Sequence, residues 1–208
     1  MPITGITRLQ ASERKAHEMA VDVYLTIQEL QKIFYDLFVS MFNSSPSQSQ
    51  VRWSWPVQGA PAFRINDDVV FLKLYDTPGT MTTLREDKYS QEDGVPNMST
   101  GYTRTLRLDC IFYGPNSWEN AVTIRNKMFW QEHHDTLAAS NLYMIPRFDP
   151  PRRIPELWQG QWYDRSDLSV SFNELVVLNR ELPYIEKVPV GVYNRNGLVT
   201  QIDITPDE

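Results

Sequence analysis

The chain has 208 residues, with 20 basic and 26 acidic side chains, a net charge of −6 and a pI near 5.1. This length suits one domain with a full hydrophobic core. The acidic balance argues against a protein that reads nucleic-acid sequence, because such proteins present a basic face to phosphates. The single cysteine, Cys110, excludes an internal disulfide and fits synthesis in a reducing cytosol. No apolar run approaches the ~20 residues of a membrane span, so we expect no membrane partner.

The N-terminal part of the chain combines a polar extension with a strongly amphipathic helix. Residues 1–22 are mixed in charge and have no apolar face, so we interpret them as an arm that a partner orders. Thr26 and Glu29 then form a capping box. The apolar stripe beyond it predicts a helix up to Phe42, and it consists of Ile27, Leu30, Ile33, Phe34, Leu37, Phe38 and Met41. A serine-rich linker follows this helix.

The middle of the chain alternates between short strands and one long polar stretch. Residues 51–55, 69–75 and 82–89 have strand character. The polar stretch from Ser90 to Gly101 predicts a loop, and a loop of this length in a compact domain is usually functional or disordered. Residues 102–113 make the best strand, because Leu106, Leu108, Cys110 and Phe112 alternate with mostly polar residues.

A second helix is predicted directly after the turn at Gly114-Pro115-Asn116. Asn116 and Glu119 supply a cap pair, and the helix extends to about Glu132. Its expected inner face consists of Trp118, Ala121, Val122, Arg125 and Phe129. A short strand at 142–145 and a proline-rich connection at 148–155 follow.

The C-terminal part is predicted to be mainly β-structure. Residues 161–177 alternate in polarity, and Glu174 interrupts the alternation, which indicates a bulge or an exposed strand end. Residues 194–197 suit a hairpin turn. We therefore expect an arm at 1–22, a domain at 23–187 and a β-prone arm at 188–208. The order of elements predicts an α+β domain, with two principal helices packed on one face of a mainly antiparallel, mixed sheet.

The sequence contains few candidates for chemistry. Adjacent residues in His133-His134-Asp135 point about 100° apart on a helix and do not easily share one metal, so a solvated helix end near the negative pole explains them better. Asp67-Asp68 fits a turn before a strand. There is no phosphate-binding loop and no nucleophile elbow. We predict no catalytic, cofactor-binding or metal site; a metal-dependent nuclease using Asp68, Asp109 and His133 is the less favoured alternative.

Two motifs in residues 103–167 carry a family resemblance. A strand ends in Phe112-Tyr113-Gly114-Pro115-Asn116 and opens a helix, and Arg152-Arg153-Ile154-Pro155-Glu156-Leu157 leads to Gly160-Gln161-Trp162-Tyr163. In this order and spacing, the motifs resemble the phage neck and tail terminator protein family. The first predicted helix lies where the first helix of the family lies, and residues 190–204 are similar to its closing strands. Residues 1–22 and the 90–101 stretch lie outside the family pattern.

The resemblance implies a structural virion protein that is made and assembled in the host cytoplasm. It implies a ring of six copies that caps the tail tube, stops tube growth and docks to the head-tail connector or a stopper protein. Genomic DNA would pass through the lumen without specific binding. Like charge repels phosphate, so we assign Gln91, Glu92, Asp93 and Asn97 to the lumen or to an inter-ring contact.

Four further residues are candidates for contacts between subunits. They are Arg152, Arg153, Trp158 and Trp162. For the two arginines the alternative interpretation is a solvated pair that keeps a loop soluble. Two other functions stay open: another neck or tail ring protein, such as a stopper or tube subunit, and a host-interaction or regulatory module.

Overall fold

The computed structural model describes residues 22–42, 50–54, 63–92, 95–183, 188–194 and 197–204. Within these ranges the core is a seven-stranded sheet in the order β1-β2-β4-β9-β5, with β3 paired to β4 and β6 paired to β9. β1 and β2 are parallel and the other pairs are antiparallel. The strands are β1 (Val51–Trp53), β2 (Val69–Asp76), β3 (Glu86–Glu92), β4 (Val95–Tyr113), β5 (Leu142–Ile145), β6 (Arg152–Arg153) and β9 (Arg165–Glu181).

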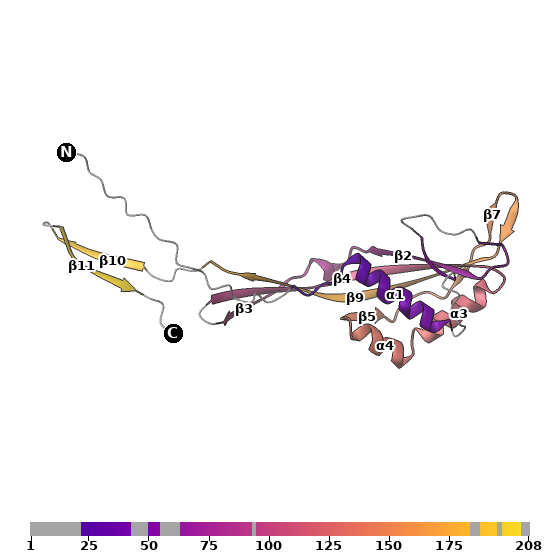
Figure 1. The fold of residues 1–208 in the computed structure, drawn as a ribbon, viewed down its shortest axis with the longest axis horizontal. Helices are drawn as coiled ribbons and strands as arrows, with labels where there is room; N and C mark the ends of the chain where they lie inside the picture. The colour runs from indigo at the N-terminus through magenta and orange to yellow at the C-terminus, as the bar shows by residue number, and fades with distance from the viewer. Residues whose placement is uncertain are drawn as a thin grey trace.

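Helices α1 (Ile27–Met41), α3 (Ser117–Lys127) and α4 (Gln131–Ala138) cover one face of this sheet (Figure 1). α1 begins at the predicted capping box, where the Thr26 amide donates to the Glu29 carboxylate at 2.8 Å. Its buried stripe packs on the strands, and the rings of Phe34 and Phe172 have centroids 4.8 Å apart. The α+β class and the helix-covered, mainly antiparallel sheet are therefore confirmed. We call the opposite side of the sheet, which none of the described helices α1, α3 and α4 covers, the open face.

β4 and β9 are much longer than the other strands. They pair from Tyr113↔Arg165 to Asn97↔Glu181. β2 pairs with the part of β4 from Leu106 to Tyr113, and β3 pairs with the part from Val95 to Gly101. The sheet therefore continues as three strands beyond the helices, as Figure 1 shows. We call this extension, made of β3 with residues 95–101 and 177–181, the ribbon.

The predicted loop between Ser90 and Gly101 is wrong. These residues belong to the β3–β4 hairpin, in which Ser90 pairs with Asn97 and Glu92 with Val95. Asp93-Gly94, a dipeptide typical of tight hairpin turns, lies between the paired ends. The sequence here lacks the polar–apolar alternation that predicts a strand. Much of the ribbon is open to solvent, so its residues need not alternate. The strand predicted at residues 82–89 is also only partly correct. Its first two residues belong to the short helix α2 (Thr80–Thr83), and β3 begins at Glu86.

Glu174 is neither at a bulge nor at an exposed strand end. It keeps the regular register of β9 opposite Arg104, and only 1% of its surface is exposed. Its carboxylate accepts hydrogen bonds from Arg104 Nε at 2.8 Å, Arg104 Nη2 at 2.5 Å and the Leu25 amide at 2.8 Å. Arg104 also donates to the Leu25 carbonyl at 2.9 Å. This pair ties the segment before α1 to the sheet, so a charged side chain occupies a core position because it is fully paired.

The second predicted helix is two helices, α3 and α4, separated by residues 128–130. The inner face of α3 differs from the expected one. Trp118 and Phe129 are exposed, whereas the buried residues at helical spacing are Ser117, Ala121, Ile124 and Met128. The helix is rotated so that these residues, and not the aromatic ones, face β4 and β9.

The start of α3 is positioned by a contact distant in sequence. Asn116 precedes α3 but makes no side-chain cap. Instead its amide and its Nδ2 donate to the Asp68 carboxylate at 3.0 and 2.7 Å. Gly114 permits this approach, because it adopts a φ of +109° and a Cβ there would lie 2.9 Å from the Asp68 Cα. The turn before β2 and the turn before α3 thus form one unit.

The two ends of the chain are described only in part. β10 (Val188–Asn194) and β11 (Gly197–Ile204) form a separate antiparallel sheet, and the pairing of Asn194 with Gly197 confirms the predicted hairpin. Val23 bridges to Val177 on β9. Residues 1–21 of the predicted N-terminal arm lie outside the described ranges. None of the helices in these ranges has the length and hydropathy needed to cross a bilayer.

Candidate assembly surfaces

A polar network lies on the open face of the sheet around Asp109. Asp109 accepts hydrogen bonds from Ser169 Oγ at 2.6 Å, Tyr75 Oη at 2.8 Å and Arg107 Nε at 3.0 Å. Partial burial opposes ionisation of Asp109, but these three donors outweigh it and lower the pKa of its carboxyl. The Asp109 carboxylate is therefore ionised at neutral pH and compensated by Arg107 of the same strand.

A second paired group lies where β4 ends and β9 begins. Arg165 donates to both oxygens of Asp167 at 2.7 and 2.8 Å and to Glu156 at 3.0 Å. The Tyr113 hydroxyl donates to the same Glu156 oxygen at 2.6 Å. Burial, together with this hydrogen bond, raises the pKa of Tyr113, and the Tyr113 donor lowers the pKa of Glu156. Both groups thus keep their ordinary charge states at neutral pH.

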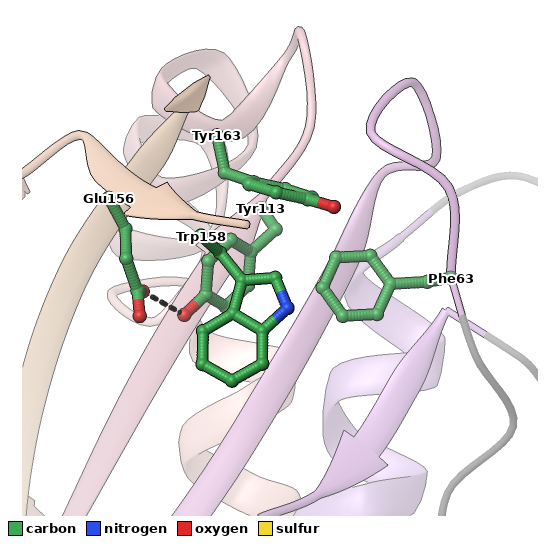
Figure 2. A pocket seen from close by; sticks show the side chains of 5 residues that line it. All are labelled: Phe63, Tyr113, Glu156, Trp158 and Tyr163. Atoms are coloured by element: carbon green, nitrogen blue, oxygen red, sulfur yellow. Dashed lines mark hydrogen bonds between the residues drawn. The ribbon is translucent and has the colours of Figure 1, made fainter. Parts of the chain in front are cut away.

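An aromatic pocket opens beside this group (Figure 2). It has a volume of about 280 Å³ and is lined by Phe63, Tyr113, Glu156, Trp158 and Tyr163. The ring of Phe63 lies 5.4 Å from that of Tyr113 and 6.1 Å from that of Tyr163. Figure 2 shows the Trp158 indole in front of Tyr113, with the Phe63 ring facing it across the opening. The pocket is a largely apolar recess with one carboxylate at its edge.

The wall formed by Trp158 belongs to the two-stranded hairpin of β7 (Glu156–Trp158) and β8 (Gln161–Tyr163). Its turn residues, Gln159 and Gly160, both have positive φ, as a type I′ hairpin turn requires. Alternation along the strands directs Trp158 to the pocket and pairs Leu157 with Trp162 on the other side. Leu157 and Trp162 are 54% and 64% exposed. The two predicted contact tryptophans therefore share one hairpin but occupy opposite faces of it.

The predicted contact arginines lie on β6, next to the start of β9. Arg152 pairs with Asp167 and Arg153 with Ser166 in the backbone register. Their side chains make exposed ion pairs within the chain, Arg152 with Asp149 and Arg153 with Asp164, both at 2.8 Å. Exposed pairs of this kind contribute little to stability.

The residues assigned to a lumen or inter-ring contact lie at the far end of the ribbon. Gln91 pairs with Pro96, and Asn97 pairs with both Ser90 and Glu181. Glu92 is the last paired residue of β3, and Asp93 lies outside the described residues. Figure 1 places β3 and β7 at opposite ends of the long strands, so the structure separates the two groups of predicted residues.

The residues considered for metal chemistry are not brought together. Asp68 is engaged with Asn116, and Asp109 with the open-face donors. In the part of the chain that the structure describes, no group of three or more His, Cys, Asp or Glu residues could hold a metal ion. The assignment of His133 to a solvated helix end is also wrong. His133 is 7% exposed in the first half of α4 and stacks on Trp130.

Because His133 is buried, we expect its titration to affect stability. Burial lowers its pKa below the ordinary 6.5. As the pH falls below that value, His133 takes up a proton in the unfolded chain but not yet in the folded chain, which favours unfolding. We expect the free energy of unfolding to fall between pH 7 and pH 5, and His133→Gln to flatten this dependence. Urea titrations at several pH values measure the free energy of unfolding of both proteins. If it changed equally with pH in wild type and in His133→Gln, the titration of His133 would not contribute to stability.

Several charged side chains of the described surface form ion pairs within the chain, and large apolar side chains are exposed on the β7–β8 hairpin and along the sheet edges. The phage neck terminator protein family matches residues 28–197, from α1 to the first residue of β11, and the chain belongs to this family. The match confirms the resemblance carried by the two sequence motifs and gives the protein a structural role in the neck of a phage virion. No curated protein matches the chain.

Proposed function

We propose that the protein is the tail terminator of a tailed phage. Copies of the chain, six in the complete ring, cap the tail tube, stop its growth and join the tail to the head-tail connector or stopper. The observation that carries this proposal is the family match over residues 28–197, which includes the helix-covered sheet, the ribbon and the β7–β8 hairpin. Assembly takes place in the host cytoplasm.

The charge arrangement supports passage of genomic DNA through such a ring without binding. The net charge of −6 repels phosphate, and two arginines of the open face, Arg107 and Arg165, form ion pairs with Asp109 and Asp167 of their own chain. The ribbon end with Gln91, Glu92, Asp93 and Asn97 combines polar and acidic groups and is suited to a lumen or to a contact with the next ring.

The β7–β8 hairpin is suited to hold a neighbouring ring, with Arg152 and Arg153 beside it. Its outward pair, Leu157 and Trp162, exposes apolar area at the opposite end from the ribbon. Exposed tryptophans often carry a large share of interface energy. We expect Trp162→Ser to leave folding unchanged within about 0.5 kcal/mol, but to weaken capping of tubes at least tenfold. Pelleting with tail tubes measures this affinity, and wild-type pelleting of the variant would contradict the role of Trp162.

Electron microscopy of the purified protein, alone and mixed with tail tubes, tests the whole proposal. We expect rings, and tubes whose ends are closed by them. A phage that lacks the protein is expected to produce overlong tails or tails without heads. A chain that stays single and leaves tube ends bare, with normal tails in its absence, would overturn the proposal.

The length of the paired strands favours one alternative, a stopper or tube subunit. Tube subunits line a continuous barrel with long strands, and β4 and β9 pair along nearly their whole length. The phenotype separates the two functions. Loss of a tube subunit abolishes tails, whereas loss of a terminator leaves tails of uncontrolled length.

A further inference from the structure

The edges of the sheet indicate how neighbouring copies of the chain contact each other. This inference rests on the proposed ring. A ring needs two different surfaces on each copy that meet head to tail. We propose that the α2 segment of one copy packs against the β5 edge of the next copy. The two surfaces lie on opposite edges of the sheet and at the same level along its strands.

The first surface is an apolar ridge beside β2. α2 (Thr80–Thr83) follows β2 and leads into β3, which pairs with β4 on the same side. Met81 and Leu84 are three residues apart and so project from one side of this turn. They are among the exposed large hydrophobic residues, and Leu84 is 58% exposed. Covering these two side chains with another apolar surface would remove their apolar area from water and so stabilise the contact.

The second surface is an apolar row along the opposite edge. On the open face, Tyr143 of β5 is paired with Asn173, and Val23 is bridged to Val177. Leu175 lies between these positions on the same side of β9, because alternate residues of a strand share a face. All three are exposed, Leu175 by 46%. They therefore form a continuous row of Tyr143, Leu175 and Val23.

Backbone pairing places both surfaces at one level. Tyr143 is opposite Asn173, and Asn173 is opposite Thr105. On the other side of β4, the Thr77 amide donates to the Thr105 carbonyl at 2.9 Å, three residues before α2 begins. Arg85, at the end of the same segment, stacks over Tyr102 at 3.8 Å. Residues 77–85 thus span the level of Tyr102 to Thr105, and the apolar row spans the level of Gly101 to Thr105.

Opposite charges lie on the two edges at the next level. Lys88 on the outer edge of β3 is opposite Ser99, and Ser99 is opposite Asn179. Asp22 accepts a hydrogen bond from the Asn179 amide at 2.7 Å on the far edge. A lysine on one edge therefore stands level with an aspartate on the other. Where the apolar surfaces of two copies meet, Asp22 of one copy comes level with Lys88 of the other, which also lies 3.5 Å from Glu86 of its own strand.

Because both surfaces lie at the same level along the strands, successive contacts of this kind would close into a ring. If the surfaces differed in height, each copy would be shifted along the axis and a helical filament would grow. Since the heights agree, successive copies are related by rotation about an axis roughly along the strands. The sheet edges are then the sides of the ring subunit, which leaves the ribbon and the β7–β8 hairpin at its two ends.

Two variants test the pairing, each with one damaged surface. Leu84→Lys damages the ridge and Leu175→Lys damages the row. Wild type should assemble and cap tubes, and each variant alone should be monomeric by native mass spectrometry and fail to cap. An equimolar mixture retains one intact contact per pair, so it should form a species of twice the monomer mass and nothing larger.

Trp118→Lys is the matched control, because it introduces the same charge at an exposed aromatic residue of α3, away from both surfaces; it should assemble as wild type does. Circular dichroism verifies that each variant is folded. Rings formed by either Leu variant, or a mixture that stays monomeric, would overturn the inference while leaving the ring proposal intact. A wild-type chain that neither assembles nor caps tubes would overturn both.

Discussion

Replacing Glu174 by alanine is expected to lower the free energy of unfolding by about 3 kcal/mol, because it breaks a buried ion pair. Glu174 is fully buried, and it accepts from two nitrogens of Arg104 and from the Leu25 amide. Without the carboxylate, the Arg104 guanidinium, whose side chain is 23% exposed, has no charged partner there. The segment before α1 also loses one of its attachments to the sheet.

Urea denaturation of the variant and wild type measures this loss. Glu181→Ala, at the exposed end of the same strand, is the control and should change stability by less than about 0.5 kcal/mol. A double-mutant cycle combines this substitution with Arg104→Met. The double variant should lose clearly less free energy of unfolding than the two single variants lose together, since no charge is then left unpaired. Additive losses would show that the pair contributes no coupling.

Gly114→Ala is expected to cost about 3 kcal/mol through backbone strain and steric overlap together. The φ of +109° at Gly114 is unfavourable for any residue with a Cβ. The added methyl would also lie 2.7 Å from the Asp67 carbonyl oxygen and 2.9 Å from the Asp68 Cα. The turn before β2 would have to move away, which would break the two hydrogen bonds between Asp68 and Asn116.

Gly160→Ala provides a matched comparison for this prediction. Gly160 also has a positive φ, +78°, but nothing lies within 4 Å of its Cβ position. Only the backbone cost of about 1 kcal/mol should remain there. Thermal and urea unfolding of the two variants separate strain from overlap. Equal losses at both positions would mean that the contact between the two turns does not contribute.

The arrangement of surfaces gives a consistent picture of a neck protein. The ribbon and the β7–β8 hairpin occupy opposite ends of β4 and β9, where a ring would meet its neighbours along the tail. The apolar ridge and row occupy the two edges, where copies would meet each other. A sheet with one helix-covered face can supply all four contacts because its edges and ends are independent of its core.

Local chemistry was sufficient to predict several elements from the sequence. The capping box of Thr26 and Glu29 and the stripe behind it predicted α1, because both signals depend on residues three and four apart. Alternation from Leu106 to Phe112 predicted the core of β4, and Pro146 marked the end of β5. The motifs around Gly114 and Gly160 indicated the family, which the match over residues 28–197 shows.

Other features depend on partners far along the chain. Glu174 interrupts the polar alternation of its strand, yet Arg104, seventy residues away, makes its burial favourable. The ribbon strands lack alternation because solvent, not a core, lies beside much of them. Packing of α3 against β4 and β9 likewise decided that Ile124 and Met128 are buried while Trp118 and Phe129 are exposed.

The sequence by itself therefore determined the class of fold, the first helix, the long strand and the family. Only the tertiary structure decided which edges carry apolar residues at the same level, since that follows from strand order and register. Periodicity assigns a residue to a face of its own element, but long-range backbone pairing alone decides what stands opposite it.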